Sequence, residues 1–180
     1  MKKDHACLFL LFFVLIATSC QQAAPKKIIE VAVLNTNLVT GFFRPGFFTE
    51  LMELKEKNSI PVYRDGKTEM NGTAVEYVKA TTVDRITESL AKVTALKESE
   101  ETRPLIRASK DLLEFGKNIF ETDYANVAKL IDEEKPRAEI DAAISKIFET
   151  HDETMALKTK ALDAVAVPYA KKHGIELRIF

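Results

Sequence analysis

His151 lies where a side chain could bind a ligand, because Ile147 and Met155 flank it at a spacing of four residues. Residues four apart share one face of a helix, so His151 and Met155 could both face a metal ion or a haem. The Glu-x-x-His pattern of di-iron bundles is absent, since Phe148 lies three residues before His151. We expect no metal and no cofactor. We interpret His151 as a histidine at the edge of a core, with a small-molecule pocket as the alternative.

A cluster of phenylalanines is the second candidate contact site. Four of them fall within seven residues, on both sides of a turn predicted at residues 44–46: Phe42, Phe43, Phe47 and Phe48. A turn in the middle prevents all four rings from pointing the same way. We expect them to plug one end of the domain. The alternative is a surface for a partner or ligand, because exposed apolar patches usually mark interaction sites.

The sequence contains no motif that would identify an enzyme. It has no G-x-S-x-G, no glycine-rich phosphate loop, no H-E-x-x-H and no C-x-x-C-H. The acidic runs at residues 98–101 and 132–134 lack the alternating spacing of a calcium loop. There are 26 basic and 27 acidic side chains, well mixed along the chain. We therefore predict neither catalysis nor nucleic-acid binding.

The first twenty residues have the parts of an export signal. Lys2 and Lys3 precede an apolar run of about ten residues, which is too short for the roughly 20 that a membrane-spanning helix needs. The run ends in small residues and a cysteine, Ala17-Thr18-Ser19-Cys20. This ending resembles the lipobox of bacterial lipoproteins. The resemblance implies cleavage after Ser19 and acylation of Cys20.

The resemblance also implies a location. A lipidated Cys20 would hold the protein at a membrane in the cell envelope. Gln21 follows the cysteine, where an aspartate would favour the inner membrane of enteric bacteria, so the periplasmic face of the outer membrane is favoured in a Gram-negative cell. The other cysteine, Cys7, lies in the predicted signal, so the mature chain would have no intrachain disulfide.

The rest of the chain predicts long amphipathic helices. One begins at Thr73, where Glu76 three residues later completes a capping box, and continues to about residue 97. A second begins near Thr102, and a third follows Pro136 and ends near Gly174, a favourable helix-terminating residue. Pro168 predicts a kink or an early stop in the third helix. Short connections make consecutive helices antiparallel.

The segment before these helices is ambiguous. Residues 28–43 are rich in β-branched side chains, which favour a strand, but their apolar positions also fit one helix face. We favour a helix, which would complete a bundle. Residues 47–58 predict a short helix, and Asp65-Gly66 predicts a hairpin turn.

Together these patterns predict a mostly α protein, an up-down antiparallel helical bundle with a small hairpin or irregular segment. An α+β fold with short terminal strands, including residues 175–180, is the alternative. We divide the chain into a signal peptide (1–19), a lipidated tether (20–27) and one helical domain (28–180). We predict a non-enzymatic, lipid-anchored envelope protein that binds or scaffolds a protein partner. A periplasmic small-molecule or metal carrier with a pocket between helices is the alternative.

Overall fold

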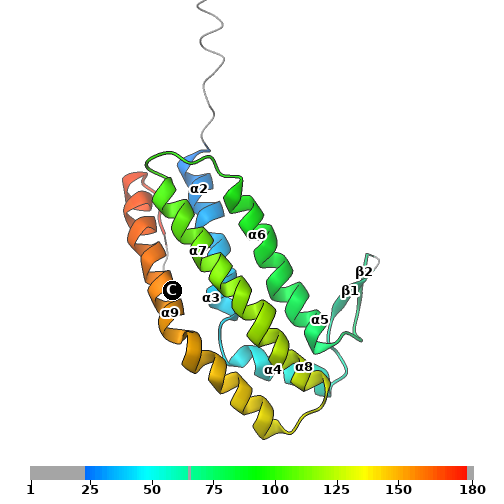
Figure 1. Ribbon diagram of the computed structural model, residues 1–180. Coiled ribbons are helices and arrows are strands. Elements are labelled where there is room, and N and C mark those ends of the chain that lie inside the picture. The colour runs from blue at the N-terminus through cyan, green and yellow to red at the C-terminus, as the bar shows by residue number, and fades with distance from the viewer. Residues whose placement is uncertain (1–22, 65, 178–180) are drawn as a thin grey trace, which may run out of the picture.

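The computed structural model describes residues 23–64 and 66–177, and these form a mostly helical bundle (Figure 1). Two of its long helical segments each combine three parts. The first runs through α5 (Ala74–Val78), η2 (Lys79–Val83) and α6 (Asp84–Thr94), and the second through α7 (Arg103–Ile119), η3 (Phe120–Tyr124) and α8 (Ala125–Asp132). The third is α9 (Arg137–Lys172). The predicted up-down bundle is confirmed. The predicted signal peptide and Cys20 lie outside the described residues.

The N-terminal segment is helical and completes the bundle. It contains α2 (Pro25–Ala32), η1 (Leu34–Thr36), α3 (Asn37–Phe42) and α4 (Gly46–Glu56). Helix α2 packs against α6, α7 and α9, and α3 packs against α6 and α7. The strand alternative for residues 28–43 is therefore wrong. Pro25 begins α2, so residues 25–27 belong to this helix and not to the predicted tether.

The predicted hairpin is present. Strands β1 (Val62–Arg64) and β2 (Lys67–Glu69) pair antiparallel, with Arg64 opposite Lys67. Figure 1 shows the hairpin projecting from the side of the bundle, joined to it near the start of α5. At the other end of the chain, residues 175–177 are neither helix nor strand, so the alternative with two terminal strands has no support among the described residues.

Polar contacts fix the ends of the helices. Thr73 Oγ1 accepts from Glu76 N at 3.1 Å and Glu76 Oε2 accepts from Thr73 N at 2.8 Å, which confirms the capping box. Asp132, at the end of α8, also caps α5: its carboxylate accepts from Ala74 N at 2.9 Å and Val75 N at 3.1 Å. A carboxylate is favourable at this position because the first N–H groups of a helix have no intrahelical partner.

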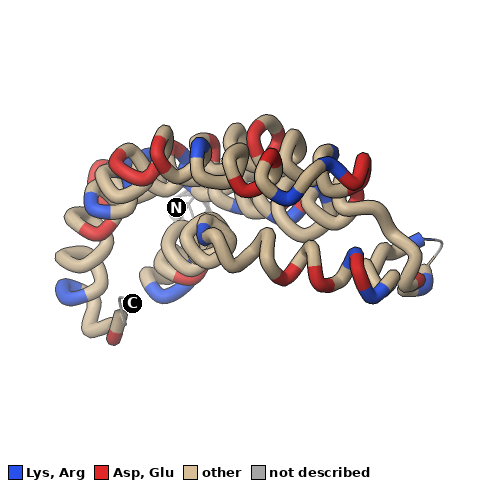
Figure 2. Tube along the Cα trace, turned by 90° about the horizontal axis from the view of Figure 1, so that it is seen from below, with Lys and Arg blue, Asp and Glu red and all other residues tan. Residues whose placement is uncertain are grey.

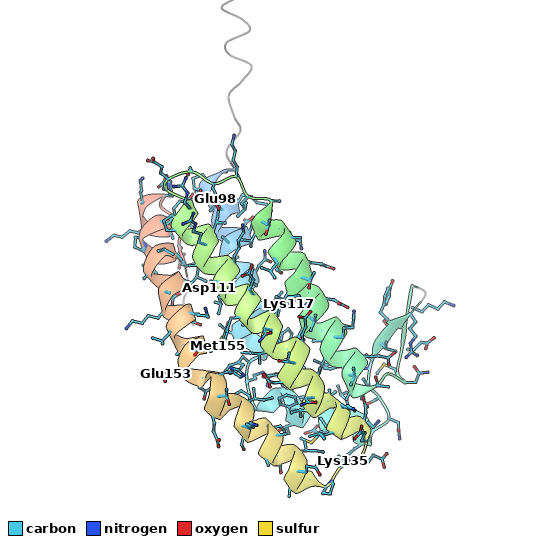
Figure 3. All side chains as sticks on the ribbon, viewed as in Figure 1. Glu98, Asp111, Lys117, Lys135, Glu153 and Met155 are labelled. Carbon is cyan, nitrogen blue, oxygen red and sulfur yellow. The ribbon has the colours of Figure 1, made fainter. Side chains whose placement is uncertain are left out.

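Helix α9 differs from its prediction in one respect. Pro168 does not end the helix, since α9 continues to Lys172. Figure 3 places Glu153 and Met155 in the region where α9 changes direction. The two limbs can therefore follow different parts of the bundle, with contacts to α7 and to α8. Asp111 on α7 accepts from Lys158 on α9 at 2.7 Å.

Basic and acidic residues are mixed along the described helices (Figure 2). Figure 2 shows Lys and Arg mixed with Asp and Glu along the helices, without a continuous stripe of one sign. Among residues 23–64 and 66–177, no helix combines the length and hydropathy required to cross a bilayer.

Candidate functional site

The candidate site is a hollow of about 400 Å³ between the η3–α8 segment and α9. Both walls contribute polar and apolar side chains: Asp123, Asn126, Val127, Leu130, Ala143, Lys146, Ile147, Thr150 and His151. The wall that carries Asp123 is a π-helical turn, and such turns are frequent at functional sites. His151, the histidine that the sequence singled out, is one of the residues that line this hollow.

His151 is held in a defined orientation. Its Nε2 lies 3.0 Å from Asp123 Oδ2, and the Phe115 ring meets the imidazole edge to face at 5.8 Å between centroids. The His151 side chain is only 20% exposed, whereas Asp123 is 41% exposed. An ionised carboxylate can only accept, so Nε2 of His151 is the donor when it bonds an ionised Asp123.

This arrangement is suited to binding. The hydroxyl of Thr150, which also faces the hollow, donates to the backbone oxygen of Lys146 at 2.7 Å, so it is not directed at His151 as a nucleophile would be. The described part of the chain contains no group of three or more His, Cys, Asp or Glu side chains that could hold a metal ion. The hollow thus offers hydrogen-bonding groups beside apolar ones.

Met155 is separated from this hollow. It is 6% exposed, belongs to the apolar core and does not line the space around His151. The structure therefore does not bring His151 and Met155 to one cavity, although they are one helical turn apart. The bend of α9 lies in the same region (Figure 3).

The phenylalanine cluster lies in and around the core. Phe47 and Phe48 are 2% and 0% exposed, and their ring centroids lie 5.3 and 4.4 Å from that of Tyr124. Phe42 and Phe43 are partly buried, and Phe43 packs on Phe148 at 5.0 Å. These contacts agree with a plug at the end of the bundle where α4 lies (Figure 1). Phe47 and Phe48 have almost no surface to offer a partner.

Large apolar side chains are exposed at the hairpin, whereas Phe47 and Phe48 are buried. Tyr63 is 71% exposed and Met70, just after β2, is 53% exposed. Sequence reasoning predicted this hairpin but not Tyr63. The available signal was the alternation around the turn, which puts Tyr63 and its opposite residue Thr68 on one face and Val62 on the other.

Arg64 attaches the hairpin to the helical bundle. Its guanidinium donates to Glu76 on α5 at 2.6 Å, to Glu69 at 3.3 Å and to Asn71 at 3.2 Å. This hydrogen bonding lowers the pKa of Glu76. Since Arg64 and Tyr63 are neighbours on a strand, their side chains point to opposite faces. The attachment therefore leaves the Tyr63 face open.

Comparisons of the chain with protein-family models, with curated proteins and with solved structures find no match.

Proposed function

We propose that this chain is a lipid-anchored protein of the bacterial cell envelope that binds a protein partner and has no catalytic activity of its own. The hairpin is the observation that supports partner binding. Tyr63 is 71% exposed there, on a strand that Arg64 bonds to α5. The anchor rests on the lipobox-like sequence that ends in Cys20. In a Gram-negative cell the proposed location is the periplasmic face of the outer membrane.

The tether in this proposal is short. Five residue-to-residue steps separate Cys20 from Pro25, where α2 begins, and an extended chain spans about 17 Å over that length. Helix α9 has 36 residues and is about 54 Å long along its axis. Figure 1 shows the start of α2 and the base of the hairpin near opposite ends of the bundle. Anchoring through Cys20 would therefore hold the base of the hairpin at a part of the bundle distant from the bilayer (Figure 1).

The hairpin has two means of recognition. Tyrosine is among the residues most often found to dominate binding energy, and a rigidly held one loses little conformational entropy on binding. In a sheet of two strands, β1 and β2 also each have an edge that a partner strand can extend. Met70 enlarges the apolar part of this surface.

Site-specific crosslinking in living cells tests the partner. A photoreactive side chain in place of Tyr63 is expected to capture one protein reproducibly, identified by mass spectrometry. The matched control is the same side chain in place of Leu157, which is 60% exposed on α9. Equal capture from both positions, or capture of lipid alone from position 63, would contradict a partner surface on the hairpin.

The anchor has a separate test. Cys20→Ala is expected to move the protein from the membrane fraction to the soluble fraction, and to block incorporation of a radiolabelled fatty acid. His173→Ala serves as a control that should change neither result. An acylated, membrane-bound Cys20→Ala variant would show that the lipobox interpretation is wrong.

A small-molecule carrier is the second candidate, and the hollow around His151 is the observation that favours it. Native mass spectrometry of the protein isolated from cells would detect a bound small molecule directly. Loss of that molecule in His151→Ala, but not in His173→Ala, would assign it to the hollow. The two histidines are well matched, because His173 also bonds a carboxylate, that of Glu101, at 2.8 Å.

A further inference from the structure

Strand β2 (Lys67–Glu69) forms an edge of the hairpin that is open to another strand. All three of its residues are exposed, and Figure 1 shows the hairpin projecting from the side of the bundle. A strand at the edge of a sheet carries N–H and C=O groups without partners, and another strand can pair with them. Which strand fits this edge depends on which backbone groups point outwards and on the side chains beside them.

The pairing within the hairpin shows which backbone groups point outwards. Arg64 and Lys67 flank the turn, and in such short hairpins the flanking pair exchanges hydrogen bonds. Hydrogen-bonded and non-hydrogen-bonded pairs alternate in an antiparallel ladder. Tyr63 and Thr68 form the next pair, so they direct their N–H and C=O groups away from each other, to the two outer edges. The open groups of β2 are therefore those of Thr68.

The outer edge of β1 is less suitable for a second strand. Ile60 O accepts from Gly72 N at 2.9 Å, so the carbonyl of Ile60 points across the hairpin. By alternation, the neighbouring Pro61 and then Tyr63 face the outer edge of β1. Proline has no N–H to donate, which interrupts this edge beside Tyr63. A second strand is therefore expected along β2.

The sequence of β2 is complementary to itself in charge. Lys67 and Glu69 lie one residue to either side of Thr68. When two copies of β2 run antiparallel about a two-fold axis at Thr68, each Lys67 lies opposite Glu69 of the other copy. The two Thr68 residues then exchange hydrogen bonds through their open groups, and the Lys67–Glu69 pairs take the positions where side chains are closest. Opposite charges at directly opposed positions stabilise a sheet.

We propose that a second copy of this chain binds along β2, so that two hairpins form one four-stranded antiparallel sheet. The pairing uses the same edge on both copies, so it closes as a dimer. Glu69 also accepts from Arg64 at 3.3 Å, and a carboxylate has enough acceptor sites for both cations. Tyr63 lies on the face opposite Arg64, so the dimer presents two Tyr63 side chains on one face of the sheet. The partner surface of the proposed function stays open in the dimer.

A covalent trap tests the pairing, since an edge of three residues forms few bonds and the copies are expected to exchange rapidly. Thr68→Cys places two sulfurs at the two-fold axis, where opposed Cα atoms lie about 5.5 Å apart, within the range of disulfides. In the full chain purified in detergent, mild oxidation is expected to form dimers several-fold faster from Thr68→Cys than from Leu157→Cys, a position 60% exposed on α9. The parent chain measures any crosslinking through Cys7 or Cys20. Equal rates from positions 68 and 157 would overturn the proposal.

Charge reversal makes the test specific to the register. In the Thr68→Cys background, Lys67→Glu opposes acidic side chains across the axis and Glu69→Lys opposes basic ones, so each variant alone is expected to form dimers several-fold more slowly. A mixture of the two variants restores the opposite charges, because an acidic strand then faces a basic one. Dimers of one copy of each, identified by tags of different mass, are expected to dominate. Mixed dimers that form no faster than either variant dimerises alone would overturn the proposal.

The outcomes separate this dimer from the partner of the proposed function. Trapping with purified protein requires neither lipidation of Cys20 nor another protein. Failure of trapping, together with capture of a different protein from position 63 in cells, would reject the dimer and support the proposed function. Efficient trapping, with no different protein captured from position 63, would support the dimer and reject the separate partner.

Discussion

The segment Phe42–Phe48 and the β1–β2 hairpin are close in sequence and are joined through α4. The segment buries its largest apolar side chains, whereas the hairpin exposes Tyr63. Phe47 and Phe48 are almost completely buried against Tyr124, whereas Tyr63 of the hairpin is 71% exposed. The first segment is richer in aromatic residues, so it is the one that sequence reasoning treated as a possible partner surface.

The difference shows that aromatic density and exposure are separate properties. Several large rings close together in sequence bury enough area to form part of a core, at roughly 25 cal/mol per Å² of apolar surface removed from water. Three-residue strands cannot do this. The hairpin depends instead on its turn and on polar attachment through Arg64, so Tyr63 is not required for its packing.

The largest expected loss of stability comes from removing a buried ring of the aromatic core. Phe48→Ala should lower the free energy of unfolding by about 3–5 kcal/mol, because it removes a fully buried ring and leaves a cavity. Tyr63→Ala should change it by less than about 0.5 kcal/mol, as at other exposed positions. Urea denaturation of the two variants compares them directly. Similar losses in both would contradict the distinction between the two regions.

A smaller loss of stability is expected from replacing Asp132, at the start of the helix to which the hairpin is attached. Asp132 caps α5 and also accepts from Lys55 Nζ at 3.1 Å. Asp132→Ala should cost about 1–3 kcal/mol, because two N–H groups and one ammonium lose their acceptor. Glu133→Ala, at the next position, is the control, since Glu133 is exposed and forms ion pairs with surface lysines only. Equal losses in urea denaturation would contradict the capping role.

Local signals were sufficient for much of the fold. The Thr73 capping box, the Gly174 terminus and the 65–66 turn all depend on residues within a few positions of one another, and the first two are present as expected. The hairpin forms around residues 65–66 as expected, with Arg64 opposite Lys67. Apolar periodicity similarly located the long helices, although it did not indicate the π-helical turns in η2 and η3.

Contacts between distant elements could not be predicted in this way. Asp123 pairs with His151 across 28 positions of sequence, and Asp132 caps a helix start 57 to 58 residues earlier. Both carboxylates belong to acidic sequences that have the ordinary appearance of solvated surface. Their partners are determined by how η3, α8 and α9 pack, which one sequence does not specify.

The third prediction tests the polar atom within the aromatic core. Tyr124 donates to the Phe42 carbonyl at 3.1 Å, and burial raises the pKa of its phenol. Tyr124→Phe should lower the free energy of unfolding by about 0.5–1.5 kcal/mol at neutral pH. Urea denaturation at neutral pH measures this loss. An unchanged midpoint would contradict a stabilising role for the hydroxyl.

The raised pKa also predicts a pH dependence. The neutral phenol is favoured in the folded state, so its contribution is complete below the ordinary tyrosine pKa of about 10 and declines as pH rises through the higher folded value. The stability difference between the parent and Tyr124→Phe should therefore shrink above about pH 10. The comparison cancels the other tyrosines, including Tyr169, whose pKa burial also raises. A constant difference would contradict the assignment.

The smallest effect on global stability is expected at the hairpin attachment itself. Arg64→Ala removes the bonds to Glu76, Glu69 and Asn71, all at the exposed surface, so the urea midpoint should scarcely move. Amide exchange in β1 and β2 should become faster while exchange in α7 stays unchanged, because the hairpin alone loses its attachment.

Lowering the pH should reproduce part of the faster amide exchange expected in β1 and β2 of Arg64→Ala. Arg64 lowers the pKa of Glu76, so the attachment is complete above the ordinary glutamate pKa of about 4.3 and is lost as pH falls through the depressed folded value.

If the hairpin binds a partner, Arg64→Ala should also reduce crosslinking from position 63 while the bundle remains folded. Unchanged exchange in β1 would mean that the turn and strand pairing alone hold the hairpin. In that case the rigidity that presents Tyr63 would come from the hairpin itself and not from α5.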